Sequence, residues 1–112
     1  MRYEYDNMQD DKVPSLIGLL RHADQDIRCI AARMLGCLGQ NATAAVPALI
    51  DVLQDSAVLV RAMAAWALGA FGQDAATAVP ALARLLGQKG APAETAEWAL
   101  KRISPGFKEM LT

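Results

Sequence analysis

Apolar residues recur along this chain with the spacing of helices, in blocks that repeat. The octets VPSLIGLL, VPALIDVL and VPALARLL begin at Val13, Val46 and Val79, so the repeat period is 33 residues. In the first two octets the apolar residues follow an i, i+3, i+4, i+7 spacing, which places them on one face of an α-helix. Three octets in register predict three copies of one structural unit.

A second periodic segment follows each octet after a short polar break. These segments are DIRCIAARMLGCLG from Asp26, LVRAMAAWALGAFG from Leu59 and PAETAEWALKRIS from Pro92, the last set one residue closer. Their predicted core stripes are Ile27, Ala31, Leu35 and Leu38 with Met34 beside them, then Val60, Ala64, Leu68 and Phe71 with Ala67. Each unit is therefore predicted to be a helix, a turn and a second helix.

Proline and glycine predict where these helices begin and end. A proline is tolerated only in the first turn of a helix, where amide protons lack an intrahelical partner. Pro14, Pro47 and Pro80 therefore place the helix starts near Asp10, Thr43 and Ala76 to Thr77, with Asp10 and Thr43 as N-caps. Gly39 and Gly72 directly follow second segments, where glycine commonly ends a helix.

A two-helix unit cannot bury its apolar stripe alone, so neighbouring units must stack into one core. We expect a single all-α domain, an α-solenoid with a right-handed superhelix, its first helices convex and its second helices concave. The predicted bounds are about 10–40, 43–73 and 76–104 for the three repeats, with 1–9 as an N-terminal extension and 105–112 as a C-terminal tail. Tyr3, Tyr5 and Met8 are expected to cover the open side of the first repeat.

The order of motifs resembles the HEAT repeat. After the VPxLIxLL octet come D-x-D-I-R, with Asp24, Asp26, Ile27 and Arg28, and A-A-x-x-L-G, with Ala31, Ala32, Leu35 and Gly36. The second unit matches with Val60, Arg61, Ala64, Ala65, Leu68 and Gly69. The form is similar to the short bacterial repeats related to phycobilisome lyases. The resemblance implies a scaffold or binding surface, since such repeats are rarely specific for one activity.

Departures from the repeat predict which unit lies at an end. In the first repeat, Asp24 is expected to cap the second helix. The equivalent residue in the second repeat is Ala57, which leaves Asp55 or Ser56 to cap the second helix there. The third unit lacks both the Asp and the Arg of the motif, and we interpret it as a C-terminal cap with an atypical outer side. Arg28 and Arg61 recur at the repeat period, so we expect them to tie neighbouring turns together.

Composition and charge exclude several classes of function. Eleven basic and twelve acidic residues give a net charge of -1 without a basic stripe, which argues against nucleic-acid binding. No apolar run approaches the ~20 residues that span a bilayer, and the N-terminus lacks a signal-peptide pattern. We therefore expect a complete cytoplasmic chain without a membrane segment.

Cysteine and histidine are too few and too dispersed for a disulfide or a zinc site. Cys29 and Cys37 lie eight residues apart on one predicted helix, about 12 Å along its axis, which is too far for a disulfide. Together with His22, placed near a helix end, they do not make a four-ligand zinc pattern. We expect reduced thiols and no metal or other cofactor.

The candidate site is the strip of the second helices that faces away from the core and from the first helices. Its members are Cys29, Arg33 and Cys37, then Ala62, Trp66 and Ala70, then Glu94, Trp98 and Arg102. One interpretation packs each tryptophan on a neighbouring helix. The other exposes the row Arg33, Trp66 and Trp98 as a binding face, because Trp and Arg are enriched at interface hot spots.

We expect a non-catalytic protein-binding module, because no nucleophile, acid–base or phosphate-loop constellation can be assembled from these residues. The partner-binding residues are predicted to be Arg33, Trp66, Trp98 and Arg102, with Cys29, Ala62 and Glu94 at the rim. The partner is a protein or a peptide. A second hypothesis is a homodimer formed through the concave face or an open end of the solenoid. A third, implied only by the resemblance, is an accessory subunit of a tetrapyrrole (bilin) lyase.

Overall fold

The three octets form the first helix of each repeat. In the computed structural model, which describes residues 12–106, the first octet lies in a helix over residues 12–19. The other two form α3 (Val46–Val52) and α5 (Val79–Leu85), each with its proline in the first turn. Proline thus stands where its missing amide proton costs no hydrogen bond.

The second periodic segments form longer helices, namely α2 (Gln25–Leu38), α4 (Val58–Phe71) and α6 (Ala91–Ile103). Gly39 and Gly72 end α2 and α4 with φ angles of 58° and 66°, a region that favours glycine. The predicted stops are therefore confirmed. Asp24 caps α2 by accepting a hydrogen bond from the Asp26 amide at 2.8 Å, as the motif predicts.

The predicted starts near Thr43 and Ala76 to Thr77 are wrong by about one turn, because α3 and α5 begin at Val46 and Val79. 3₁₀ helices over Gly39–Ala45 and Gly72–Ala78 precede α3 and α5, and neither α-helix has a side-chain N-cap. Thr43 does not cap α3; its backbone carbonyl instead accepts from the Val46 amide. The tight 3₁₀ turn supplies acceptors from the backbone, so no side chain is needed. Asp10, the other predicted cap, lies outside the described residues.

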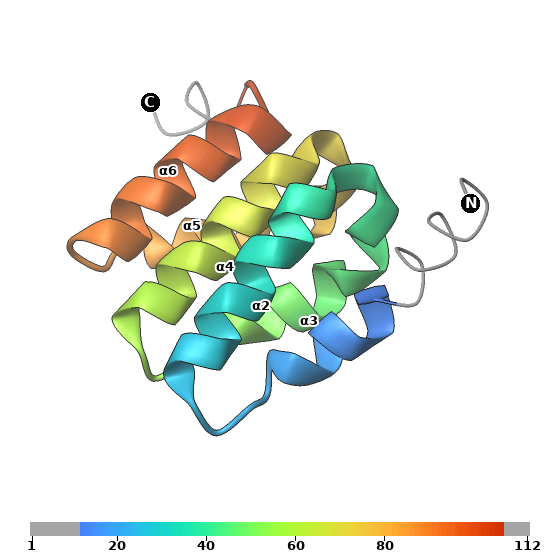
Figure 1. Cartoon of the computed structure of the whole chain (residues 1–112). Coiled ribbons are helices and arrows are strands. Elements are labelled where there is room, and N and C mark those ends of the chain that lie inside the picture. Colours follow the sequence, from blue (N-terminus) through green and yellow to red (C-terminus); the bar gives the residue numbers. More distant parts are fainter. Residues whose placement is uncertain (1–11, 107–112) are drawn as a thin grey trace.

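Two layers of helices enclose one apolar core. Figure 1 shows α2, α4 and α6 side by side in one layer, with α3 and α5 behind them. Within residues 12–106 no strand occurs. The largest fully buried aliphatic side chains come from both layers and all three repeats: Leu20, Leu35, Leu49, Leu68, Leu82, Leu100 and Val60. The all-helical solenoid predicted from the repeats is therefore confirmed.

The residues of the predicted core stripes are buried or half-buried, with one exception. Ala31, Leu35, Val60, Ala64, Ala67, Leu68 and Phe71 are buried, and Ile27 and Leu38 are half-buried. Met34, placed beside the stripe by helical spacing, is instead exposed. Its equivalent in the next repeat, Ala67, is covered by α2, whereas no described helix precedes α2 in its layer.

Arginine side chains tie adjacent repeats together. Arg28 makes two parallel hydrogen bonds to the Asp55 carboxylate, with N–O distances of 2.8 and 3.0 Å. Arg61 donates to the backbone carbonyl of Asp55 at 2.7 Å and to the Gln88 side chain at 3.1 Å. Both arginines thus have the predicted connecting role.

The Arg28–Asp55 contact shifts the pKa of both partners in the direction that favours their charged forms. Partial burial acts to raise the pKa of Asp55, but the hydrogen bonds from Arg28 and from the Ala57 amide outweigh it, so this pKa lies below its ordinary value. The hydrogen bond with Asp55 in turn raises the pKa of Arg28. Asp55 Oδ1 also accepts from the Ala57 amide at 2.9 Å, a turn contact just before α4. No side chain caps α4 itself, so the prediction that Asp55 or Ser56 caps this helix is wrong.

Candidate functional site

Trp66 lies across α2 at the position of Gly36. A Cβ atom added to Gly36 would lie 2.5 Å from Cζ3 of Trp66 and 2.9 Å from Cα of Ala67. Only glycine fits under the indole at this distance. Trp66 is half-buried, so the ring packs on a neighbouring helix and keeps part of its surface accessible.

The same contact recurs one repeat later between Trp98 and Gly69. A Cβ atom on Gly69 would lie 2.6 Å from Cζ3 of Trp98 and 2.9 Å from Cα of Ala99. The Arg102 guanidinium lies 5.2 Å from the centroid of the Trp98 ring, within the range of a cation–π contact. Its Nε also donates to the Gly69 carbonyl at 3.0 Å. Trp98 and Arg102 therefore form a local stack over α4, with Trp98 still partly exposed.

An apolar hollow of about 370 Å³ opens on the same face, between α2 and α4 with one residue from α6. We call it the apolar hollow; its lining residues are Cys29, Arg33, Leu59, Ala62, Met63, Trp66 and Thr95. Leu59, at its rim, is 67 % exposed, the highest value among the exposed large hydrophobic side chains of residues 12–106. Arg33, exposed in the third turn of α2, adds a charge to this apolar lining.

The apolar hollow contains four of the seven predicted site residues, namely Cys29, Arg33, Ala62 and Trp66. Ala62 is nearly buried, so it forms the floor rather than the rim. Trp98 and Arg102 lie on the same helix layer, but neither lines the hollow. Glu94 is exposed in the first turn of α6 and also lies outside it.

Three lining residues were not among the predicted site residues: Leu59, Met63 and Thr95. The sequence contains a signal for Leu59, because its equivalent one period earlier is Asp26. A leucine at a position that holds an acid in another repeat is an exposed apolar residue without a core role. Met63 and Thr95 occupy equivalent positions in the second and third repeats. They line the hollow because of the way α4 and α6 pack together.

The two cysteines differ in their surroundings. Cys29 is half-buried in the apolar hollow, and burial, followed by the nearby charge of Asp26, raises the pKa of its thiol. Cys37 is exposed near the other end of α2. Because the thiolate is the reactive form, the environment of Cys29 does not favour a nucleophilic role.

The described residues also bear on metal and membrane sites. Within residues 12–106, no group of three His, Cys, Asp or Glu side chains comes close enough to hold a metal ion. No helix over these residues is both long and apolar enough to cross a bilayer. His22 accepts a hydrogen bond from the Asp24 amide through Nδ1, a turn contact next to the start of α2.

The sequence matches the family model for HEAT repeats over residues 13–101. The chain belongs to the HEAT-repeat family. No curated protein matches the sequence significantly. HEAT repeats generally mediate protein–protein interactions and typically serve as non-catalytic scaffolds. The relationship to phycobilisome-lyase repeats stays a prediction, because the matching family is the broader one.

Proposed function

We propose that this HEAT-repeat protein is a non-catalytic module that binds a partner protein or peptide on the face formed by α2, α4 and α6. The apolar hollow receives an apolar side chain of the partner, with Leu59 and Trp66 as its main contacts. Arg33 contacts the partner backbone or an acidic group beside that side chain. Trp98 and Arg102 extend the contact along α6, where Glu94 forms the polar margin.

The observation that carries this proposal is the exposed Leu59 beside an apolar hollow on the same face as Trp66 and Arg33. Its volume of about 370 Å³ lies within the usual range of ligand sites, roughly 300–1,000 Å³. Exposed apolar surface of this kind is commonly an interaction site. An amphipathic helix or an extended segment with one apolar anchor would suit it.

The experiment is the selection of peptides on the purified protein from a phage-displayed random library. Selection is run on the wild type and on Ala62→Leu, in which the added side chain fills the floor of the hollow. We expect the wild type to enrich peptides that share an apolar anchor, and Ala62→Leu, checked as folded by circular dichroism, to lose them. Failure to enrich any sequence, or equal binding to both proteins, would contradict the proposal.

A second candidate function is homodimer formation through the N-terminal end of the array. Leu19, Ile30 and Met34 are 39 %, 54 % and 43 % exposed, respectively. The positions equivalent to Leu19 and Met34 in the second repeat, Val52 and Ala67, are buried. These side chains therefore form an apolar end that a second copy would cover, and the concentration dependence of the molecular mass tests this alternative.

A further inference from the structure

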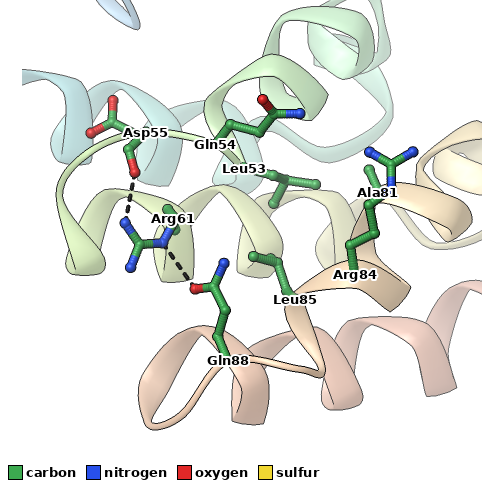
Figure 2. A pocket seen from close by; sticks show the side chains of 8 residues that line it. All are labelled: Leu53, Gln54, Asp55, Arg61, Ala81, Arg84, Leu85 and Gln88. Carbon is green, nitrogen blue, oxygen red and sulfur yellow. Dashed lines mark hydrogen bonds between the residues drawn. The ribbon is translucent and has the colours of Figure 1, made fainter.

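Two hollows lie along the edge of the array where each first helix turns into its second helix. The first edge hollow surrounds Arg28 and has a volume of about 390 Å³. The second edge hollow surrounds Arg61 and has a volume of about 340 Å³ (Figure 2). Most residues that line one are related to those of the other by the 33-residue period, so the chain builds the same hollow twice.

The two copies share their apolar walls and differ in charge. Leu20 and Val52 of the first edge hollow correspond to Leu53 and Leu85 of the second. At two other pairs of equivalent positions an acid is lost: Asp51 is replaced by Arg84, and Asp55 is replaced by Gln88. Two further pairs change in the opposite sense, because Arg21 is replaced by Gln54 and His22 by Asp55.

In the first edge hollow the arginine is neutralised by direct contact. Both nitrogen–oxygen contacts between Arg28 and Asp55 are short, at 2.8 and 3.0 Å, and form a bidentate pair. The two side chains are 14 % and 11 % exposed. Arg28 also donates to the backbone carbonyls of His22 and Ala23 at 2.8 and 3.0 Å. Little of its hydrogen-bonding capacity remains for a ligand.

In the second edge hollow the equivalent arginine has only neutral acceptors. Arg61 uses two of its five N–H donors, one on the Asp55 carbonyl and one on the Gln88 side chain. The Asp55 carboxylate is engaged by Arg28 and by the Ala57 amide. Among residues 12–106, neither Arg61 nor Arg84 forms an ion pair.

Figure 2 shows how these groups surround the hollow. Arg61 and Gln88 lie on one side and Arg84 on the other, with Leu53 and Leu85 between them. A ligand in this hollow would meet apolar surface at its centre and a guanidinium on each side. This combination suits a short peptide segment with acidic side chains, because guanidinium groups bind carboxylates with charge-assisted hydrogen bonds.

We propose that the second edge hollow is a binding site for an acidic segment of the partner protein, with a carboxylate bound by Arg61 and a second one attracted by Arg84. The proposal rests on the proposed function only in taking a protein as the partner. Gln88 has a specific part in it: the first copy has an aspartate hydrogen-bonded to its arginine, whereas glutamine leaves Arg61 without a carboxylate hydrogen-bond partner.

The test is titration with a hexaglutamate peptide at low ionic strength, followed by NMR at the Arg61 Nε–Hε group. We expect the peptide to shift this signal and that of the Gln88 amide. Gln88→Asp gives Arg61 the carboxylate that Arg28 already has. It should weaken peptide affinity about tenfold, the scale of one charge-assisted contact, and at the same time raise the melting temperature. Arg84→Asp should also weaken binding.

The matched control is Arg21→Asp, which changes the net charge as much as Arg84→Asp but lies in the first edge hollow. We expect its peptide affinity to stay within about twofold of the wild type, the range of weak long-range screening effects. An equal loss in Arg21→Asp would show that net charge alone attracts the peptide and would overturn the proposal. Undiminished binding to Gln88→Asp, or an unshifted Arg61 signal, would overturn it too.

The outcome is separable from that of the proposed function. Leu59→Ser alters the rim of the apolar hollow and leaves the second edge hollow unchanged, so hexaglutamate affinity should not change in that variant. Peptides selected through the apolar hollow should conversely bind Gln88→Asp as they bind the wild type. Failure of one prediction therefore leaves the other standing.

Discussion

The two ends of the array are built differently. At the N-terminal end, Leu19, Ile30 and Met34 present apolar side chains that no described helix covers. At the C-terminal end, the outer side of α6 carries Glu97 and Lys101, an i, i+4 pair with a nitrogen–oxygen distance of 3.3 Å. The N-terminal end therefore has an apolar surface like that of a repeat junction, whereas this side of α6 is charged.

Equivalent positions inside the array show what each end has changed. Lys101 occupies the position of Gly36 and Gly69, the glycines on which the tryptophans pack. Glu97 likewise occupies the position of Ala32 and Ala65, both fully buried. The C-terminal end has thus lost the small residues that would receive a further repeat. Terminal repeats of solenoids need such a polar outer side.

The residue type at a repeat position therefore depends on whether a neighbouring helix covers that position. At the C-terminal end, Glu97 and Lys101 occupy positions that hold alanine and glycine at the junctions between repeats. This charged pair prevents further stacking of repeats there. Large apolar residues at the N-terminal end leave a surface that a partner or a second copy can bury. Head-to-tail association is therefore disfavoured. Of the contacts through the ends of the array, one between two N-terminal ends best fits the proposed homodimer.

The largest effect should come from Gly36→Val. The new side chain would meet the Trp66 ring and the Ala67 backbone at distances that no rotamer relieves. We expect the free energy of unfolding, measured by urea denaturation, to fall by about 3 kcal/mol, the scale of severe overpacking. The control is Lys101→Val at the equivalent open position, which should stay within about 0.5 kcal/mol of the wild type. Similar losses in the free energy of unfolding in both variants would show that the junction and the C-terminal end do not differ in this way.

A smaller effect should come from acid, through the junction nearest the N-terminal end. The pKa of Asp55 is lowered in the folded state, so its ion pair stabilises the fold fully above the ordinary carboxyl pKa of about 4. This contribution is lost as the pH falls through the lower pKa of the folded state. Urea midpoints of the wild type and Asp55→Asn should therefore differ at neutral pH and converge in acid. A difference that stays constant with pH would rule out the Arg28–Asp55 pair as its source.

The smallest effect on stability should come from placing a pair of opposite charges at the N-terminal end, like the pair at the C-terminal end. The double variant Ile30→Glu with Met34→Lys places an i, i+4 ion pair on the exposed side of α2. We expect the free energy of unfolding to change by less than about 0.5 kcal/mol, because both positions are already accessible. For the homodimer alternative, light scattering should show a wild-type mass that rises with concentration and a variant that stays monomeric. A monomeric wild type at every concentration would exclude this alternative.

The repeat register made much of the fold predictable. The 33-residue period fixed the helix pairs, and Gly39 and Gly72 marked the ends of α2 and α4 because positive φ angles favour glycine. The 3₁₀ turns were missed, since backbone carbonyls replace side-chain caps there and leave no mark in the sequence.

The candidate site was less predictable, because its contacts join residues about one repeat apart. The packing of Trp66 on Gly36 depends on how closely α2 and α4 approach, which the spacing along one helix does not determine. Four of the predicted residues line the apolar hollow, but the hollow also depends on Leu59 from α4 and Thr95 from α6. Repeat comparison, position by position, would have found Leu59 and Gln88 as departures.

The most direct test of the binding face compares Leu59→Ser with Val58→Ser. Both residues are exposed and adjacent in the first turn of α4, but only Leu59 lines the apolar hollow. Affinity is measured for a peptide selected on the wild type, together with alkylation of Cys29 in the hollow and of the exposed Cys37 as an internal control. We predict a loss of about tenfold or more for Leu59→Ser, little change for Val58→Ser, and protection of Cys29 alone in the complex. Equal losses in the two variants, or a Cys29 that reacts as fast with peptide bound, would contradict the assignment of this face as the partner site.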